Sequence, residues 1–431
     1  MGIYKYWCVL LLMLPASAFA GETELSQSNT AWILTSTALV LFMSLPGLAL
    51  FYGGLVRSKN VLSVLMQCFA IAGVLSLLWL VVGYSWAFTE GNSFIGDFSR
   101  VMFSGIDRDT LSGDIPESLF AMFQMTFAVI TAALIVGGFA ERMRFSAVLG
   151  FSVVWSLAVY VPVTHWVWGG GWLSQIGVYD FAGGIVVHIT AGVGALVAAL
   201  VLGPRRGFPT TPMPPHNLTM TVTGAGMLWV GWFGFNGGSA LAANGDAAMA
   251  IVVTHISAAA GLVVWSVIEW VRYGKPSALG AVTGMVAGLG TITPASGFVG
   301  PGGALLIGIC AGAVCFFATQ LIKRKLKIDD SLDVFSVHGV GGVLGTILVA
   351  IFASTELGVF SGYGFADGIE SIWGQLQVQL IGVVVTILYT AVVSFAILKA
   401  VQLFTPLRVN EEDEVEGLDV TDHEETGYNL H

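Results

Sequence analysis

The sequence predicts an all-α polytopic membrane protein, and three observations support this. Of its 431 residues, 55% are hydrophobic and only 10% are charged, whereas a soluble protein carries about 25% charged residues. Eleven apolar runs are each long enough to cross a bilayer as a helix. The loops between these runs alternate between basic and non-basic, which is the pattern of a chain that crosses the membrane repeatedly.

The first twenty residues have the pattern of a secretory signal peptide. Lys5 supplies a short positive region, WCVLLLML an apolar core, and Ala18-Phe19-Ala20 an A-x-A cleavage site. We therefore expect residues 1–20 to be removed after Ala20. The alternative is that they are retained as an additional span, but the apolar core is short for that role.

The eleven predicted spans lie near residues 31–54, 61–88, 118–140, 145–168, 181–203, 218–237, 247–271, 277–293, 302–322, 334–354 and 375–402. Lys and Arg gather in the loops VRSKN, ERMR, GPRRGFP, RYGK and KRKLK, and the intervening loops are neutral or acidic. By the positive-inside rule the basic loops face the cytoplasm, which places the N-terminus outside and the C-terminus inside. Residues 21–408 then form one membrane domain, and residues 409–431 form a cytoplasmic tail.

A weak internal repeat divides the spans into two halves. The first span ends in FYGG and the sixth in FNGG; the fifth follows Asp180 and carries His188, and the tenth follows Asp333 and carries His338. Because five is odd, the second half enters the membrane from the opposite side. We predict two inverted five-helix repeats, about 31–203 and 218–354, with the helix 375–402 left over. Such repeats place a transport site at their interface.

His188 and His338 are the candidate site residues of the two halves. A histidine within a span is a functional hypothesis by default, and the glycines around both allow close helix contact. Two neutral imidazoles can lie side by side if one donates its N–H to the bare nitrogen of the other. The alternative is polar residues that only bind helices together. Two histidines alone rarely hold a metal, so we expect no metal and no cofactor.

Polar and aromatic residues near the outer ends of spans form a second group of candidates. Asp180 is suited to cap the fifth span, and its charge also favours a cation at the outer mouth. Phe123 and Phe127 share one face of the third span, while Trp168, Phe235 and Ser239 end the fourth and sixth spans. Rings and a hydroxyl at one depth can hold a small cation. Singly, each ring is also explained by an interfacial aromatic belt.

These segments resemble the ammonium transporters of the Amt/Mep/Rh superfamily, from the first span to the tail. The resemblance rests on FYGGLVR, FAVITAALIVGGFAERM, HWVWGGGWL, DFAGGIVVHI, GWFGFNGGSALAAN, DVFSVHGVGG and GLDV, in that order. It implies a homotrimer with one pore per subunit. It also implies an ammonium recruitment site at Phe127, Trp168 and Ser239 supported by Asp180, a gate of Phe127 and Phe235 with Phe123 nearby, and a twin-histidine pair, His188 and His338.

The acidic tail is a further candidate for function. Residues 409–431 hold nine acids and neither Lys nor Arg, so much of the net charge of −10 belongs to this tail, and nothing indicates a nucleic-acid partner. The tail resembles the region of related transporters that binds PII-type signal proteins. Glu424 stands where glycine is common. The alternative is a solvated tail that only prevents aggregation. The residues that carry the resemblance are Gly417, Leu418, Asp419, Val420, His423 and Tyr428.

The resemblance implies transport of ammonium or ammonia across the inner membrane. Ammonium would be recruited outside, lose a proton, and cross as ammonia past the histidines. Two alternatives stay open, namely an ammonium sensor and an electroneutral gas channel. An intramembrane enzyme would need a nucleophile or a metal set facing His188; the sequence offers neither, so we expect no enzyme.

Overall fold

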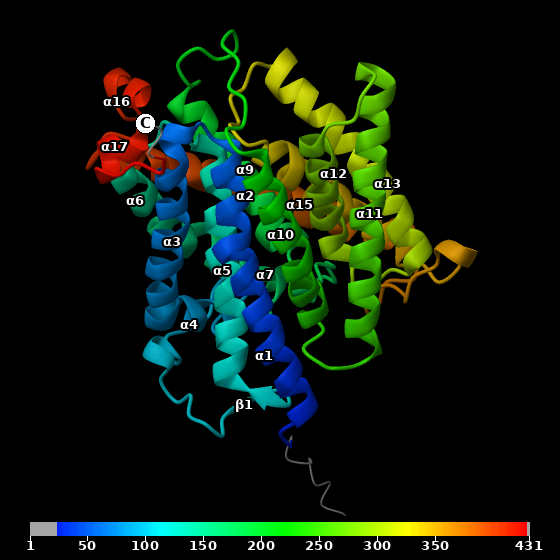
Figure 1. Cartoon of the computed structure of the whole chain (residues 1–431). Coiled ribbons are helices and arrows are strands. Elements are labelled where there is room, and N and C mark those ends of the chain that lie inside the picture. The colour runs from blue at the N-terminus through cyan, green and yellow to red at the C-terminus, as the bar shows by residue number, and fades with distance from the viewer. Residues whose placement is uncertain (1–23, 429–431) are drawn as a thin grey trace, which may run out of the picture.

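The computed structural model describes residues 24–428, so the predicted signal peptide, residues 1–20, lies outside the described residues. Within 24–428, eleven helical segments are long and apolar enough to cross a membrane, one at each predicted position (Figure 1). The predicted all-α polytopic fold is therefore confirmed. The chain starts α1 at one end of the bundle, here the α1 end, and places its last helices at the opposite end, here the tail end (Figure 1).

Four of the first five spans are assembled from shorter helical pieces joined end to end, and the third is the single helix α5. In order they are α1 (Gln27–Phe42), η1 (Met43–Leu48) and α2 (Ala49–Leu55); η2 (Ser58–Asn60), α3 (Val61–Leu78), η3 (Trp79–Gly83) and α4 (Tyr84–Phe88); α5 (Glu117–Phe139); α6 (Phe145–Trp155), η5 (Ser156–Tyr160), α7 (Val161–Val167) and α8 (Trp172–Gln175); and η6 (Gly184–Ile189) with α9 (Thr190–Leu202).

Each of the remaining spans is either a single helix or two helical pieces joined end to end. They are α10 (Leu218–Gly238); α11 (Gly245–Tyr273); α12 (Ala278–Ile292) with η7 (Thr293–Ala295); α13 (Pro301–Gln320) with η8 (Leu321–Lys325); η9 (Phe335–Gly339) with α14 (Val340–Phe352); and α15 (Ile372–Gln402). Outside the spans lie η4 (Val101–Phe103), the hairpin β1 (Leu111–Ser112) and β2 (Ile115–Pro116), η10 (Gly358–Phe360), α16 (Glu411–Glu416) and α17 (Leu418–His423).

Several spans contain a π-helical stretch, and the two stretches that open the fifth and tenth spans carry the histidines. His188 lies in η6 and His338 in η9. In the first span, Leu45 leaves helical geometry immediately before Pro46 (φ −131°, ψ 91°), because proline has no backbone N–H and disfavours a helical residue before it. π-stretches often occur at functional positions in helices.

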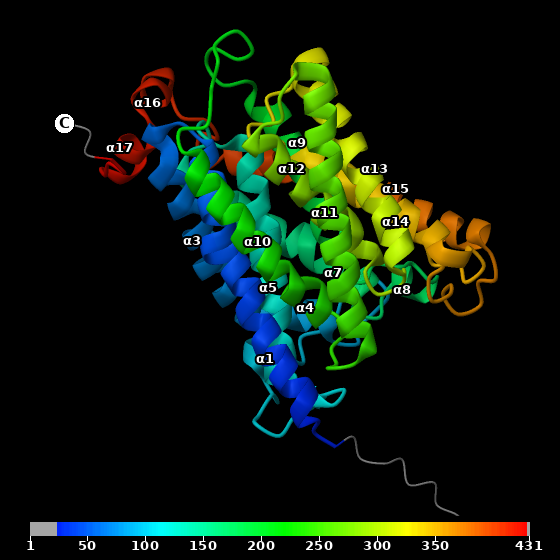
Figure 2. The same cartoon turned by 45° about the vertical axis from the view of Figure 1, so that its right-hand side comes forward.

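The two halves contact each other reciprocally, as the predicted inverted repeat requires. Helix α9 packs against η9, and α14 packs against η6. Helix α14 also lies beside α15 (Figure 2). A Cβ on Gly192, four residues after His188, would lie 2.3 Å from the Cα of Gly339. A Cβ on Gly342, four residues after His338, would lie 3.0 Å from the Cβ of His188. Such pairwise exchange of contacts is what a two-fold axis produces.

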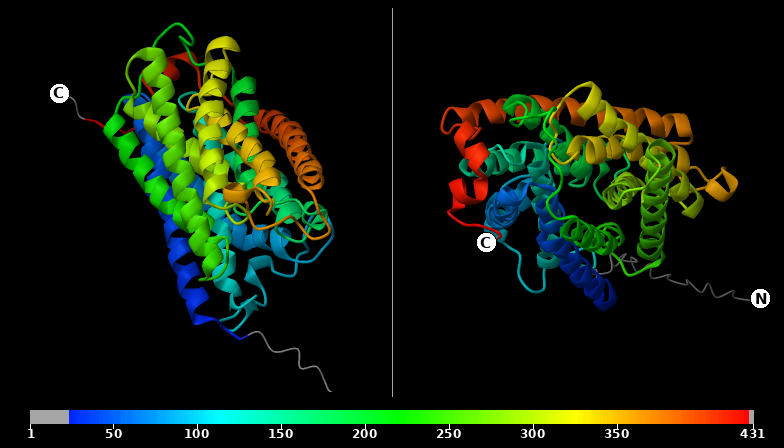
Figure 3. Two further views of the ribbon diagram at one scale, coloured as in Figure 1. Left: turned by 90° about the vertical axis from the view of Figure 1, so that its right-hand side faces the viewer. Right: turned by 45° about the horizontal axis from the view of Figure 1, so that its top comes forward.

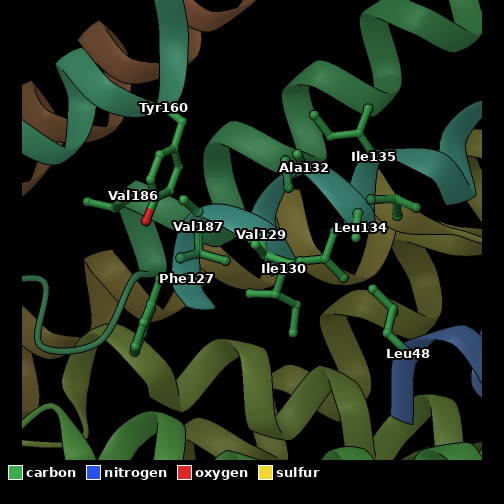
Figure 4. Close-up of a cluster of buried hydrophobic side chains, with 14 of the residues drawn as sticks. Leu48, Phe127, Val129, Ile130, Ala132, Leu134, Ile135, Tyr160, Val186 and Val187 are labelled. Carbon is green, nitrogen blue, oxygen red and sulfur yellow. The ribbon is translucent and has the colours of Figure 1, made fainter. Parts of the chain in front are cut away.

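Helix α5 lies at the centre of the core, and α15 lies at its periphery. In the most apolar 18-residue stretch of each helix, 89% of the residues of α5 are buried, against 33% of those of α15. Helix α15 runs along one edge of the bundle in both views of Figure 3. Figure 4 shows Phe127, Ile130 and Leu134 of α5 packed with Leu48 and Val187. Helix α5 is therefore surrounded by other parts of the same chain.

The acidic tail is folded onto the tail end of the bundle. Helix α17 packs against α3 (Figure 1), and Leu418 and Asp419 are buried. The interpretation of this segment as a freely solvated extension is therefore wrong for residues 409–428. The physical reason is local, because the apolar Leu418 and a hydrogen-bonding carboxylate are embedded in an otherwise acidic sequence.

Candidate functional site

Three cavities follow one another between the two halves. The first chamber, about 270 Å³, lies at the α1 end and is lined by Phe127, Trp168 and Ser239, among others. The middle chamber, about 10 Å³, contains His188 and His338. The third chamber, about 250 Å³, lies at the tail end and shares His338 with the middle one. The arrangement is a pair of open vestibules joined by a narrow, largely apolar passage.

The first chamber brings together the predicted ring and hydroxyl. The rings of Phe127 and Trp168 meet edge to face with centroids 5.8 Å apart. The Ser239 hydroxyl donates to the carbonyl oxygen of Phe235 at 2.8 Å, so its lone pairs remain free to accept from a ligand. The Trp168 indole N–H donates to the backbone oxygen of Asp180 at 2.7 Å, which fixes that ring. An electron-rich ring and an acceptor oxygen suit a small cation with N–H groups.

Asp180 caps the fifth span as expected, and does so with both carboxylate oxygens. Oδ1 accepts from the backbone N–H groups of Gly183 and Gly184 at 2.9 and 2.5 Å, and Oδ2 from those of Ile185 and Val186 at 2.8 and 3.0 Å. Burial raises the pKa of Asp180 to about 6, and these hydrogen bonds oppose the rise. The four N–H donors favour the ionised carboxylate, and Asp180 supports Trp168 from behind without lining the chamber itself.

Two phenylalanine rings separate the first chamber from the middle one. Phe127 borders the first chamber, Phe235 borders the middle chamber, and their centroids lie 4.3 Å apart at 34°. Phe123 packs on the edge of Phe127, with centroids 5.0 Å apart at 73°, and borders neither chamber. The predicted gate thus consists of two rings in the path and a third ring that holds one of them in place.

His188 and His338 lie side by side in the middle chamber. Their Nδ1 atoms are 3.2 Å apart, a hydrogen-bond distance, and both rings are buried. One Nδ1 must therefore carry a hydrogen and the other must be bare, because two N–H groups or two bare nitrogens would repel. It follows that one Nε2 is bare and the other protonated. The Nε2 of His188 has no hydrogen-bond partner among the described residues.

Two residues that line the chambers, Trp232 and Gln124, were not predicted from the sequence. Trp232 stacks on His188 with centroids 5.4 Å apart at 17°, and its N–H donates to the Thr293 hydroxyl at 2.9 Å. Trp232 lies three residues before Phe235, on one face of α10, and this spacing could have revealed it. Gln124 lines the first chamber and lies three residues before Phe127 on α5, the same spacing as between Trp232 and Phe235.

The true counterpart of Asp180 is Asp330, and the prediction of Asp333 for this place is wrong. Asp330 Oδ2 accepts from the backbone N–H of Phe335 at 2.7 Å, whereas Asp333 pairs with Lys323 at 2.8 Å in the third chamber. The spacing could have revealed this, since 188 − 180 and 338 − 330 both equal eight. Burial and the neighbouring Asp333 raise the pKa of Asp330 to about 7.

A buried ionic cluster lies at the tail end of the bundle. Glu141 contacts Arg57 at 3.0 Å and Arg205 at 2.7 Å, and Arg205 also contacts Asp329 at 2.8 Å. Burial alone would raise the pKa of Glu141, but the two arginines outweigh it and the pKa is lowered. The Asn60 amide donates to Glu141 at 3.0 Å. This cluster joins four loops that lie far apart in the sequence.

The predicted regulatory tail is attached to this cluster. The backbone N–H of Leu418 donates to the Asn60 side-chain oxygen at 2.8 Å, and Asp419 accepts from the backbone N–H of Ser63 at 2.8 Å. Gly417 adopts φ +118°, a conformation that favours glycine. Val420 is partly exposed, with 38% of its surface accessible.

The last described residues continue along the same surface. His423 packs on the ring of Phe145 with centroids 5.0 Å apart, and the Tyr428 hydroxyl lies 2.9 Å from the His216 Nε2 atom. Glu424 occupies a left-handed conformation at φ +55°, which explains physically why glycine is common there.

Comparison with known proteins identifies relatives along nearly the whole chain. The family model described as "Ammonium Transporter Family" matches residues 31–428. The ammonium transporter of Bacillus subtilis is 49% identical over 394 residues, covering 91% of this chain and 96% of that protein. Ammonium transporter Amt1 of Archaeoglobus fulgidus is 44% identical over 406 residues, covering 94% of this chain and 100% of that protein.

Solved structures of related proteins share the fold. Mep2 of Saccharomyces cerevisiae matches with a TM-score of 0.82 at 38% identity, covering 90% of this chain and 92% of that one. A structure titled "Sensor Amt Protein" matches with a TM-score of 0.85 at 31% identity, covering 92% of this chain and 98% of that one.

Proposed function

The chain belongs to the ammonium transporter family, and on that premise we propose the route by which it moves ammonium across a membrane. Its relatives are non-enzymatic membrane transporters, and its own eleven apolar helices make it a multi-pass membrane protein. The route runs through the first, middle and third chambers in turn.

We assign the first chamber to the outside and the tail to the cytoplasm of the inner membrane. The basis is the distribution of Lys and Arg, whose loops lie at the tail end together with the cluster of Arg57, Glu141 and Arg205. Loops rich in Lys and Arg stay on the cytoplasmic side. A cleaved signal peptide, residues 1–20, accounts for an N-terminus on the outer side.

Ammonium is recruited in the first chamber by Phe127, Trp168 and Ser239. The two rings offer their π-faces, the Ser239 hydroxyl accepts one N–H, and Asp180 adds a negative field from behind. These groups replace part of the hydration that the cation loses on entry. Gln124, whose side-chain oxygen has no hydrogen-bond partner in the described part of the chain, can accept a further N–H.

Crossing the middle chamber requires the loss of a proton. A space of about 10 Å³ holds at most one water, so a hydrated ion cannot pass, and an unhydrated ion pays a large desolvation cost. Potassium cannot avoid this cost, whereas ammonium can, because it deprotonates to neutral ammonia. The histidine pair then offers ammonia one N–H donor and one bare nitrogen, which match its lone pair and its N–H groups.

Assembly and regulation complete the proposal. We assign the functional unit as a homotrimer with one pore in each subunit. A PII-type signal protein is the proposed partner of the cytoplasmic face, where Gly417, Leu418 and Asp419 anchor the tail and His423 and Tyr428 extend the surface. The buried contacts of this tail with Asn60 and Ser63 support a regulatory role, because Asn60 joins the tail to Glu141 in the ionic cluster of the tail end.

The observation that carries the proposal is the bonded histidine pair inside a passage too narrow for a hydrated ion. The test is current on solid-supported membranes that carry the purified protein, after pulses of ammonium and of potassium. A current with ammonium alone supports a selective, charge-moving transporter. Ammonia uptake without current, seen with a pH-sensitive dye in the vesicles, favours the electroneutral gas channel.

The similarity to a structure titled "Sensor Amt Protein" supports an ammonium sensor as a second candidate function. Ammonium binding without current and without uptake would favour the sensor. Binding would be followed by the quenching of Trp168 fluorescence, with Trp168→Phe as the control.

A further inference from the structure

A groove lies on the outer surface of the bundle between the last parts of α9 and α15. Its volume is about 660 Å³. The walls come from three residues of α9, Val197, Leu200 and Val201, and from four residues of α15 between Ala391 and Lys399. Both helices finish at the tail end of the bundle, so the groove lies in the half of the membrane next to that end. We call it the α9–α15 groove.

The length and polarity of the α9–α15 groove match one leaflet of a bilayer. Its wall on α15 runs from Ala391 to Lys399, about 12 Å along the helix at 1.5 Å per residue. The hydrocarbon core of a bilayer is about 30 Å thick, so one leaflet contributes about 15 Å. The apolar part of the groove therefore points to the middle of the membrane, and Lys399 marks the end at its surface.

Lys399 holds a positive charge over the surface end of the groove. Its side chain is exposed, and its Nζ atom lies 5.6 Å from the centroid of the Phe395 ring. Its hydrogen bond to Oε1 of Gln402 is long, at 3.4 Å. No ion pair among residues 24–428 includes Lys399. The ammonium group is thus available to an anion, and the Gln402 amide offers a second N–H donor beside it.

The walls of the groove suit a flexible chain better than another helix. Leu200 and Val392 are 57% and 68% exposed, and no glycine is among the described residues that line the groove. Helices that pack against each other in membranes use small residues at their contacts. Directly after α15, Leu403 and Phe404 are 83% and 90% exposed. Such exposed apolar side chains mark a membrane contact, so this edge of the bundle faces lipid.

We propose that the α9–α15 groove binds one anionic phospholipid of the leaflet at the tail end. An acyl chain lies between the two helices, and the lipid phosphate accepts hydrogen bonds from Lys399 Nζ and from the Gln402 amide. A zwitterionic lipid gains less from Lys399, because its own cation already balances its phosphate. One Lys at the membrane surface favours an anionic lipid about fivefold. The inference concerns the lipid contacts of the chain and does not depend on the transport route.

The first test measures which lipid lies beside the groove. A fluorescent label is attached at Ala396→Cys, in a Cys310→Ala background, and full-length protein is reconstituted in phosphatidylcholine vesicles. Phosphatidylglycerol or phosphatidylcholine with a nitroxide on its acyl chain is then added as the quencher. We expect the quenching to show phosphatidylglycerol enriched about fivefold over phosphatidylcholine. A label at Leu388→Cys, on α15 outside the groove, is the control and should be quenched equally by both.

The second test assigns the preference to Lys399 and to the groove. Lys399→Gln should abolish the enrichment, whereas Lys325→Gln, at the same end of the bundle in η8, should leave it unchanged. Val392→Phe narrows the groove and should reduce quenching by phosphatidylglycerol, while Val384→Phe, outside the groove, should not. Neither variant should change the oligomeric state in light scattering.

Three results would overturn the proposal. The first is equal quenching of the Ala396 label by both lipids in wild type. The second is a preference for phosphatidylglycerol that survives Lys399→Gln. The third is weak quenching by either lipid together with an altered oligomeric state in Val392→Phe, because the groove would then be a contact between protein chains.

Discussion

Replacement of Asp180 by Asn should destabilise the protein by an amount that the structure allows us to work out. The carboxylate accepts four backbone hydrogen bonds, two on each oxygen. Asn replaces one oxygen with an NH₂ group, so two of the four backbone N–H groups lose their acceptor. Hydrogen bonds to charged groups contribute about 1.5–3 kcal/mol each. The expected loss is therefore about 3–6 kcal/mol.

The assay is thermal unfolding of purified protein in detergent, followed by tryptophan fluorescence. The apparent Tm of Asp180→Asn should fall on the order of 5 °C or more, and ammonium transport should fall with it, because Trp168 is anchored on the backbone of Asp180. Asp246→Asn is the matched control, since Asp246 lies exposed in the first turn of α11. Equal Tm values for the two variants would refute the assignment of Asp180 as the buried cap of the fifth span.

The remaining predictions concern the helix crossing, the tail and the buried Asp330. Gly192→Val should prevent the accumulation of folded protein, because its Cβ would lie 2.3 Å from Gly339; normal yield of a monodisperse variant would contradict the close crossing. Asp419→Asn should increase proteolysis of the tail at least several-fold in a timed digest with a protease that cleaves after Glu, because the buried acceptor that anchors α17 is weakened; unchanged digestion would mean that this contact does not anchor the tail. The contribution of Asp330 to stability should decrease as pH rises from about 4 to about 7, because burial raises its folded-state pKa from the ordinary value of 3.8 to about 7. Asp330→Asn should therefore flatten the change of apparent Tm between pH 5 and pH 8. A variant with the same Tm profile as wild type would contradict this assignment of the raised pKa to Asp330.

The spans could be predicted from sequence because each depends on local composition alone. An apolar run must become a helix in a bilayer, where every backbone N–H and C=O needs a partner within its own segment. The break at Leu45 and the π-stretches that carry His188 and His338 could not be located in this way. They depend on packing against other helices, which leaves little trace in local hydropathy.

The site was predictable where residues repeat and unpredictable where distant loops meet. The pairing of His188 with His338 followed from their corresponding positions in the two halves. Asp330 was missed in favour of the nearer Asp333, although its eight-residue spacing matches that of Asp180. In the ionic cluster, Arg205 contacts Glu141, 64 residues away, and Asp329, 124 residues away. No local sequence pattern predicts such contacts.

The tail shows a different limit of sequence reasoning. Its acidic composition is typical of a solvated extension, and composition averages over the few residues that matter. Leu418 and Asp419 fold the segment onto α3 through one buried side chain and one hydrogen bond to the backbone of Ser63. Such anchors become visible only when the receiving surface is known.

The most direct test of the central claim is the ion selectivity of His188→Ala on solid-supported membranes. We propose that the histidine pair and the narrow passage together force ammonium to give up its proton, so wild type should show current with ammonium and none with potassium. Loss of one imidazole opens space in the middle chamber for water, and His188→Ala should then carry potassium as well. A variant that still conducts ammonium and still excludes potassium would contradict the role assigned to the pair.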